Sequence, residues 1–454
     1  MAGQRPRAER RPAHSQKSGP LEVSPAAADP PDADPSPNPS SNTADVAAEN
    51  KLPNQEQRAT WLELFFDLIF VTAFDQLAKR FSDDDTLRGF STFALMFVAV
   101  WWAWVGNTLF AGRYGNQERP YRWGTALQLL SMGGLALGVL GDLQDVGAFF
   151  SVVFAVNRFI LVGMYAFQAR SSDSPELAYT QMRTFGLSAA VWLASAWLPP
   201  GWQQVAWGSA VGIDALAPLV SRRVQGQNLP HPEHLPERVG LLTIISLGAV
   251  ITEIVAGAGN KPLSFVDQLP AALSLLLSLA LFKLYFDEAR DLPVLLAHRD
   301  GRVGTLLVWL YSHLPLTLAL TALGVGIGHG IAHGGKEANQ VERITVGLSL
   351  TAIFVNLATL RFVTQHALGK LRMDLSVWAL IFGSAAMLGL MFAPLRTLPY
   401  QAATLAVCGA ALIAVWRDPA RRFLSRTEEA VAEEIHQAGD GDGSDDEQPP
   451  TPQT

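Results

Sequence analysis

Apolar runs recur along the middle of this 454-residue chain, and they restrict it to one class of fold. A helix of about 20 residues crosses the hydrocarbon core of a bilayer, and twelve runs approach or reach that length. One such run could be a buried helix of a large soluble protein, but twelve in series could not. The runs cover residues 61–78, 90–111, 122–141, 147–169, 183–198, 202–220, 239–258, 266–286, 303–327, 341–361, 374–393 and 398–416. We predict an all-α, polytopic integral membrane protein with about 12 transmembrane helices.

The two ends of the chain differ from this central region. Residues 1–56 are rich in Pro, Ala, Ser and Asp, and residues 427–454 are rich in acidic side chains. Segments with so few large apolar side chains cannot offset the entropy that ordering would cost. We therefore predict a disordered N-terminal tail at 1–56, a transmembrane domain at 57–420 and a disordered acidic tail at 427–454.

The composition excludes several classes of function. Charged residues make up 17% of the chain, whereas soluble domains contain about 25%. The formal net charge of −7 argues against a nucleic-acid partner, and the single cysteine, Cys408, allows no intrachain disulfide. Two histidine pairs, His231 with His234 and His329 with His333, lack the Cys or carboxylate partners of a zinc signature. No nucleotide-binding motif is present, so we expect no cofactor and no metal.

Basic residues between the runs indicate the orientation of the chain. If the N-terminus is cytoplasmic, about twenty Lys and Arg residues fall on the cytoplasmic side and about seven on the other. We predict a multi-pass protein of the inner (plasma) membrane with both termini in the cytoplasm.

A weak internal repeat is visible in the sequence. The third run begins near RWGTALQLL (122–130) and the ninth near RVGTLLVWL (302–310). Asp75 and Glu253 also lie equally far from the starts of the first and seventh runs. These observations favour two six-helix repeats in the same orientation, at 58–220 and 235–416, although apolar segments also resemble one another by chance.

Charged residues inside the runs are the candidates for function, because a charge in hydrocarbon is costly and faces the interior of a bundle. Glu63 and Asp67 are four residues apart and share a helix face, and Asp75 lies further along the same run. Arg158 falls at the centre of the fourth run, at a depth from which either Asp67 or Asp75 could be its partner. Such a pair could serve transport or merely fix helix packing.

Other polar residues extend this set. His313 precedes Pro315, where a helix kink could let the imidazole relay protons, although a purely structural histidine is the alternative. Asp214 and Glu253 each need a partner inside the bilayer, while Lys283 could reach the interface. The predicted substrate or ion pathway comprises Glu63, Asp67, Asp75, Arg158, Glu253 and His313.

Four short motifs carry a family resemblance: WLELFFDLIFV (61–71), HLPERVGLLTIISLG (234–248), LYFDEA (284–289) and YSHLPL (311–316). Together they resemble the bacterial low temperature requirement A (LtrA) family of polytopic membrane proteins. The resemblance implies a membrane protein linked by name to growth in the cold, without an established biochemical activity. The family's recurrent polar positions fall on Glu63, Asp67, His234, Glu237, Arg238, Asp287 and His313. Ala249 departs from the pattern, because the family commonly has a glutamate there, and Glu253 is one turn away.

The leading functional hypothesis is passage of a small solute or ion through a polar seam lined by the first helix. Its partners would be the bilayer and that unidentified solute or ion, and the sequence sets no oligomeric state. One alternative is a membrane enzyme acting on lipid, with residues 231–238 and Asp287 at the interface. Another is a scaffold or sensor without chemistry. Transport ranks above enzymatic activity because the polar groups lie at membrane depth.

Overall fold

The computed structural model describes residues 59–139, 143–171, 175–221, 229–259, 264–333, 340–370 and 372–441. Every helix discussed below belongs to one compact unit, Asn54–Thr454. The N-terminal tail predicted to be disordered, at 1–56, lies outside the described residues. Within these ranges the regular structure is helical, with no β-strand, which confirms the all-α class.

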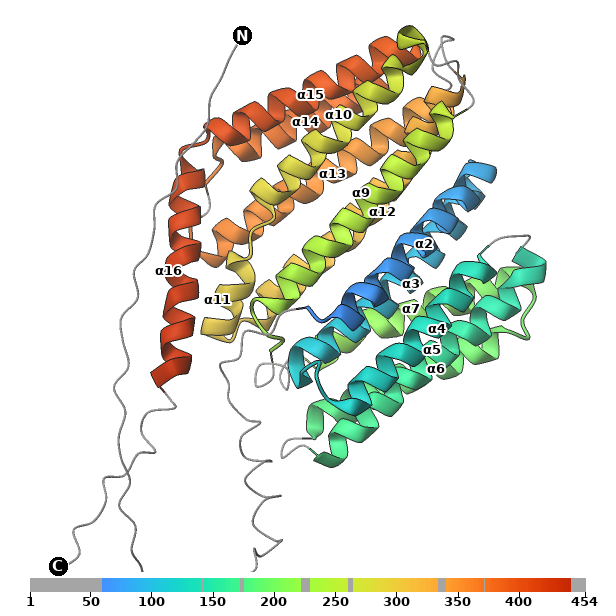
Figure 1. Ribbon diagram of the computed structural model, residues 1–454, viewed down its shortest axis with the longest axis vertical. Helices are drawn as coiled ribbons and strands as arrows, with labels where there is room; N and C mark the ends of the chain where they lie inside the picture. The colour runs from blue at the N-terminus through green and yellow to red at the C-terminus, as the bar shows by residue number, and fades with distance from the viewer. Residues whose placement is uncertain are drawn as a thin grey trace, which may run out of the picture. The chain divides into compact units, whose positions relative to one another are not determined.

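The helices form two groups that lie side by side in Figure 1. The first group consists of α2 (Trp61–Asp83), α3 (Leu87–Tyr114), α4 (Arg119–Gly138), α5 (Leu143–Ser171), α6 (Glu176–Ser195) and α7 (Pro200–Val220). The second consists of α9 (His234–Ala258), α10 (Phe265–Glu288), α11 (Leu292–Asp300), α12 (Val303–His333), α13 (Gln340–Ala367), α14 (Leu375–Met391), α15 (Thr397–Arg417) and α16 (Ala420–Gly441). Each of the twelve predicted runs coincides with one of these helices.

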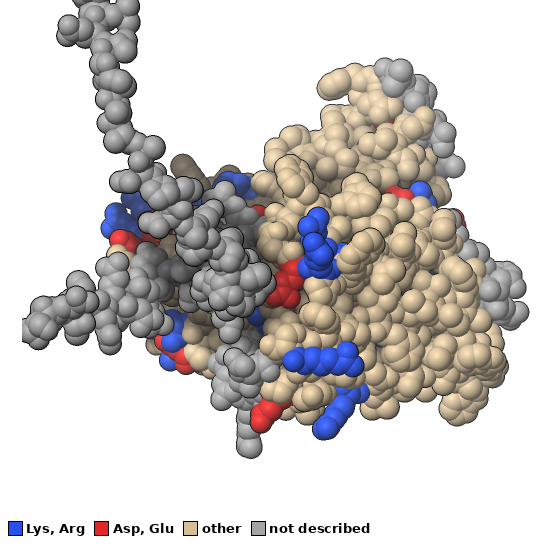
Figure 2. Space-filling view, turned by 60° about the horizontal axis from the view of Figure 1, so that its bottom comes forward, with Lys and Arg blue, Asp and Glu red and all other residues tan. Residues whose placement is uncertain are grey.

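Length and hydropathy support a membrane location. In the described residues, seven helical segments are long and apolar enough to cross a bilayer. Large apolar side chains such as Phe65, Leu68 and Phe382 are exposed on the outside of the helices, as lipid contact requires. Figure 2 shows a broad area of surface without charged side chains. The chain therefore has the architecture of a polytopic membrane protein.

The neighbour relations within the two groups correspond. In the first group α2 packs on α3 and α4, and the series continues as α4–α5, α5–α6, α6–α7 and α3–α7. In the second group α9 packs on α10 and α12, followed by α12–α13, α13–α14, α14–α15 and α10–α15. The groups meet where α2 and α3 pack against α9 and α12. We call this junction the seam.

Glycines allow α9 and α12 to approach very closely. A Cβ atom on Gly257 of α9 would clash with the carbonyl oxygen of Gly328 on α12. A Cβ atom on Gly324 would lie 2.9 Å from the Cα atom of Val250. The two helices are therefore in backbone-to-backbone contact along this stretch.

The helix ends differ from the predicted boundaries at several places, and two of these differences have a clear physical reason. The seventh helix begins at His234, five residues before the predicted 239, because Pro236 falls in the first turn, where a missing N–H costs nothing. Residues 427–441, predicted to be disordered, are helical as part of α16. The acidic composition conceals an apolar side of α16: Val431, together with Leu424 just before this segment, is buried in a cluster with Leu292, Leu295 and Leu296 of α11.

Candidate functional site

Two charged pairs meet where α2 crosses α9. Glu63 and Asp67 are one turn apart on α2, and His234 and Arg238 are one turn apart on α9. The Nε2 atom of His234 lies 3.0 Å from Glu63 Oε1, and Arg238 Nη1 lies 3.2 Å from the same oxygen. Arg238 Nη2 lies 2.8 Å from Asp67 Oδ1. All four side chains are buried, and we call them the α2–α9 cluster.

Residues at the start of α2 and around the start of α4 position Glu63. Thr60 caps α2, and the Glu63 carboxylate accepts hydrogen bonds from the Thr60 backbone N–H (2.8 Å) and hydroxyl (3.0 Å). Asn116 Nδ2 (2.9 Å) and the Tyr121 hydroxyl (3.1 Å) also donate to this carboxylate. Its two oxygens are thus fully engaged with donors from the α2 cap, α4, the α3–α4 connection and α9, which fixes the carboxylate in place.

Asp67 has fewer partners. Trp104 Nε1 donates to Asp67 Oδ1 at 2.8 Å, the oxygen that also binds Arg238. The guanidinium of Arg238 lies over the Trp104 ring, 5.6 Å from its centroid. Among the residues that the structure describes, Asp67 Oδ2 and His234 Nδ1 have no hydrogen-bond partner although both atoms are buried. Buried polar atoms are usually hydrogen-bonded, so leaving these two atoms without a partner costs free energy.

The charge of the cluster is unbalanced when His234 is neutral. Two carboxylates then face a single guanidinium, which leaves one negative charge in a buried site. Burying net charge costs several kcal/mol (order of magnitude). One additional proton, or one cation, would neutralise the site.

A chain of buried hydrogen bonds leads away from the cluster across α3 and α4. The Tyr121 hydroxyl also lies 3.3 Å from Asn107 Oδ1, and Asn107 Nδ2 donates to Thr125 Oγ1 (3.0 Å) and Gln128 Oε1 (2.9 Å). The Gln128 backbone carbonyl accepts from the Ser131 hydroxyl at 2.7 Å.

A second set of buried hydrogen bonds reaches α5. Asn157 Nδ2 donates to Ser131 Oγ at 2.8 Å. The two sets are not one continuous hydrogen-bond chain, because Asn107 bonds the Gln128 side chain whereas Ser131 bonds the Gln128 backbone carbonyl. Together they place buried polar groups from the start of α2 to the middle of α5.

Arg158 itself has a different partner from either of the two predicted. Arg158 Nη2 lies 3.0 Å from Asp214 Oδ2 of α7, and both side chains are fully buried. The prediction of Asp67 or Asp75 was wrong because it assumed that the first and fourth spans pack together. In the structure α4 packs against both α2 and α5, and α5 packs against α7, which carries Asp214. The rings of Phe154 and Phe185 flank the guanidinium at 4.9 and 5.5 Å.

Asp75 and Glu253 lie apart from the α2–α9 cluster. Asp75 is eight residues beyond Asp67, about 12 Å along the helix axis, and binds Lys79 Nζ at 2.7 Å. Glu253 is buried beside Gly328 of α12, fifteen residues beyond Arg238. The structure therefore does not bring these two predicted pathway residues into the cluster.

His313 is also separate. It is fully buried on α12, and its Nδ1–H donates to the Trp309 carbonyl at 2.8 Å. Its ring lies 4.5 Å from that of Trp309 and 5.8 Å from that of Tyr285. Within the described chain its Nε2 atom has no hydrogen-bond partner. Asp67, Arg158 and His313 thus occupy three distinct environments.

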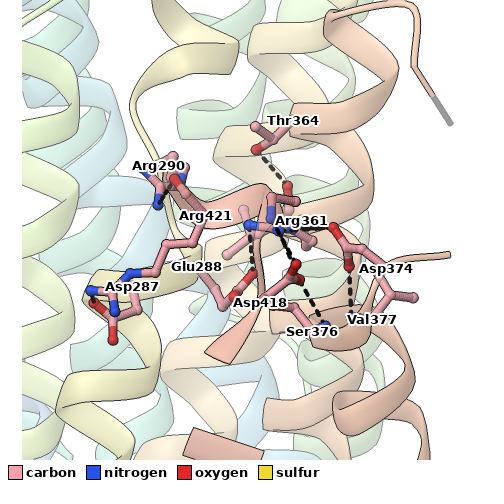
Figure 3. A network of polar contacts seen from close by, with 12 residues as sticks. Asp287, Glu288, Arg290, Arg361, Thr364, Asp374, Ser376, Val377, Asp418 and Arg421 are labelled. Atoms are coloured by element: carbon pink, nitrogen blue, oxygen red, sulfur yellow. Dashed lines mark hydrogen bonds and ion pairs between the residues drawn. The ribbon is translucent and has the colours of Figure 1, made fainter. Parts of the chain in front are cut away.

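Asp287 belongs to a second polar network, shown in Figure 3. Its Oδ1 atom accepts from Lys283 Nζ (3.0 Å) and Arg421 Nη2 (2.6 Å). Beside it, the buried Arg361 of α13 lies among three carboxylates. Arg361 Nη1 lies 3.6 Å from Glu288 Oε2, and Arg361 Nη2 lies 2.8 Å from Asp374 Oδ2 and 3.2 Å from Asp418 Oδ2. We call Arg361 and these three residues the Arg361 network.

Glu237, the remaining family position, is not part of the cluster, and its Oε2 accepts a hydrogen bond from the Ala59 backbone N–H at 3.3 Å. It is exposed and lines a cavity of about 620 Å³ together with Glu233, Tyr285 and Phe286. His231, in the segment before α9, is anchored by a backbone hydrogen bond to the Gly112 carbonyl (2.7 Å). Burial lowers the pKa of His231, so its neutral form is favoured.

Several site residues were not predicted from the sequence. Asn107 and Gln128 are amides within apolar runs, a signal that was present but that charged residues overshadowed. Trp104, Asn116 and Tyr121 gave no comparable signal, because tryptophan is common in apolar runs and the other two lie beside a basic connection.

Comparison with known proteins identifies the family of this chain. Residues 58–415 match the family described as bacterial low temperature requirement A protein (LtrA), which confirms the resemblance seen in the sequence. The chain is 26% identical over 296 residues to an uncharacterized protein of Rhizobium meliloti (strain 1021), covering 61% of this chain and 71% of that relative. No solved structure matches the chain. This chain belongs to the bacterial low temperature requirement A (LtrA) family.

Proposed function

We propose that this protein transports an ion or small solute along the seam, with the α2–α9 cluster as the site where charge is bound and released. The observation that carries the proposal is the buried Glu63–His234–Arg238–Asp67 arrangement, which joins the first helix group to the second. Ionisable side chains inside a membrane bundle mark substrate, ion or proton pathways. In this proposal the chain crosses the inner membrane twelve times and both termini are cytoplasmic.

The corresponding neighbour relations of the two groups support a duplication, with repeats at 58–220 and 235–416. RWGTALQLL and RVGTLLVWL lie at the starts of α4 and α12, which hold equivalent places in the two groups. Transporters built from repeats bind substrate where the repeats meet and work by rocking one repeat against the other. The α2–α9 cluster occupies such a junction.

The charges suggest how binding would be coupled to movement. Separating α2 from α9 breaks the ion pairs of Arg238, and breaking a buried pair costs about 3–5 kcal/mol. A proton on Asp67, or a cation beside it, weakens the attraction between Asp67 and Arg238 and so lowers that cost. Occupation of the cluster would thereby favour opening of the seam.

Replacement of Asp67 tests the proposal. In the purified protein reconstituted into vesicles, we expect Asp67→Asn to abolish flux driven by proton or cation gradients, because the amide cannot bind the charge. Asp75→Asn is the matched control, since Asp75 lies on the same helix but outside the α2–α9 cluster, where it bonds to Gln76 and Lys79. Thermal unfolding should show both variants folded. Equal flux in the Asp67 variant and the wild type, or no wild-type flux under any gradient, contradicts the proposal.

A further inference from the structure

A second cavity lies at the ends of helices α13 to α16, far along the chain from the α2–α9 cluster. It has a volume of about 570 Å³ and lies between the end of α13, the start of α14 and the α15–α16 junction. Its walls are largely apolar, formed by Leu368, Met373, Leu375, Phe423 and Leu424. We call it the α13–α16 pocket.

Two basic side chains line this pocket. Lys370 and Arg372 are exposed lining residues, and neither has a carboxylate partner within the described residues. The Lys370 ammonium lies 4.4 Å from the centroid of the Phe423 ring. Basic side chains beside apolar walls match a phosphate group whose hydrocarbon chains continue into the membrane.

Negative charge lies deeper in the same pocket. Asp374 and Asp418 line it and belong to the Arg361 network (Figure 3). With Glu288, three carboxylates surround a single guanidinium, while the neighbouring Arg421 bonds to Asp287. Both oxygens of Glu288 are buried without a hydrogen-bond partner in the part of the chain that the structure describes. The inner wall of the pocket is therefore acidic, whereas Lys370 and Arg372 make its outer part basic.

The surroundings place the pocket at the membrane–water interface. Trp416, at the end of α15, and Trp378, in the first turn of α14, are both exposed. Indole rings favour that interface, and the predicted topology puts these helix ends on the cytoplasmic side. Exposed Phe382, one turn beyond Trp378, continues the apolar surface toward the hydrocarbon.

We propose that the α13–α16 pocket binds the headgroup of a phospholipid with a primary ammonium, of the phosphatidylethanolamine type. The phosphate binds Lys370 and Arg372, the ammonium lies toward Asp374 and Asp418, and the acyl chains lie along α14. An ammonium carries three N–H donors, whereas the trimethylammonium of phosphatidylcholine has none, so the carboxylates distinguish the two lipids. This inference does not depend on transport through the seam.

Lipid titration of the delipidated full-length protein, followed by native mass spectrometry, tests the proposal. We expect dioleoyl-phosphatidylethanolamine to bind roughly tenfold more tightly than dioleoyl-phosphatidylcholine, the effect of about one charge-assisted hydrogen bond. Lys370→Gln with Arg372→Gln should weaken binding of both lipids by roughly fivefold for each cation removed. Arg396→Gln, an exposed arginine preceding α15, is the matched control and should leave binding unchanged.

A second variant tests the carboxylates. Asp374→Asn removes one negative charge from the wall of the pocket while keeping the size of the side chain and a residue type that can cap α14, so the preference for the ethanolamine lipid should fall and choline-lipid binding should not. Thermal unfolding checks that each variant is folded. Equal binding of the two lipids, tighter binding of dioleoyl-phosphatidylglycerol than of the ethanolamine lipid, or unchanged binding by the Lys370/Arg372 double variant would each overturn the proposal.

Discussion

Three fully buried arginines differ in how many carboxylates they face. Arg158 pairs with one, Arg238 with two and Arg361 with three. The first pair is neutral and also has aromatic rings around it, so nothing further is needed to balance its charge. Each of the other two arginines faces more carboxylates than one guanidinium can neutralise, so a proton, ion, ligand or further basic group is needed to balance the charge. Charge balance thus separates a structural pair from candidate binding sites.

The Arg158–Asp214 pair should therefore contribute to stability and not to transport. Arg158→Met leaves Asp214 buried without its partner, and we expect a loss of about 3–5 kcal/mol in stability. The double variant Arg158→Met with Asp214→Leu should recover most of that loss, because apolar groups of similar volume replace the ion pair.

Melting temperatures in detergent measure this recovery, and vesicle flux by the double variant shows whether the pair is needed for function. A double variant that melts like the wild type yet carries no flux would show that Arg158 has a role in the pathway after all.

The buried charges themselves could be predicted from the sequence, but their pairing could not. Glu63, Asp67 and Arg158 are conspicuous because each is a charge within an apolar run. Their partners depend on which helices are neighbours, and helix order along the chain does not determine that. Arg238 was recognised only through a family motif, since the helix that contains it was predicted to begin one residue later.

At the scale of elements, α16 shows how composition can mislead. Residues 427–441 of this helix are rich in Glu and were predicted to be disordered, yet α16 packs on α11 through Leu424 and Val431. Ion pairs hold it in place: Arg290 binds Glu428 (3.1 Å) and Arg299 binds Glu434 (3.4 Å). Apolar residues recur at helical spacing in this part of the sequence, but the average composition does not reveal such spacing.

Removal of residues 427–454 should expose α11. The truncation deletes Glu428, Val431 and Glu434, so we expect faster amide hydrogen exchange in residues 292–300, measured by mass spectrometry. Removal of 442–454 alone is the control and should change nothing there, because it leaves α16 complete. Unchanged exchange in the longer truncation would mean that α16 does not stabilise α11.

At the scale of the whole molecule, the sequence predicted the helices well because a bilayer imposes both the length and the polarity of a span. The seam could not be predicted, because both groups have similar apolar surfaces and the sequence does not show that α2 and α3 pack against α9 and α12. The topology itself remains open to a direct chemical test.

Cysteine labelling provides that test. Cys408 is the single cysteine of the chain, so Cys408→Ala gives a background without thiols. In intact cells a membrane-impermeant maleimide should label Asp85→Cys, in the α2–α3 connection, and should label Gln117→Cys, in the α3–α4 connection, only after lysis. The reverse pattern would place both termini outside, and labelling of both positions from one side would contradict a spanning α3.

The backbone contact between Gly257 and Gly328 has a mechanical consequence. Sliding α9 along α12 would bring a residue with a side chain into this backbone contact, so the close approach opposes sliding. Arg238 lies on α9 and His313 on α12. We therefore expect a movement that separates Arg238 from Asp67 to displace His313 as well, although the two residues are not bonded to each other.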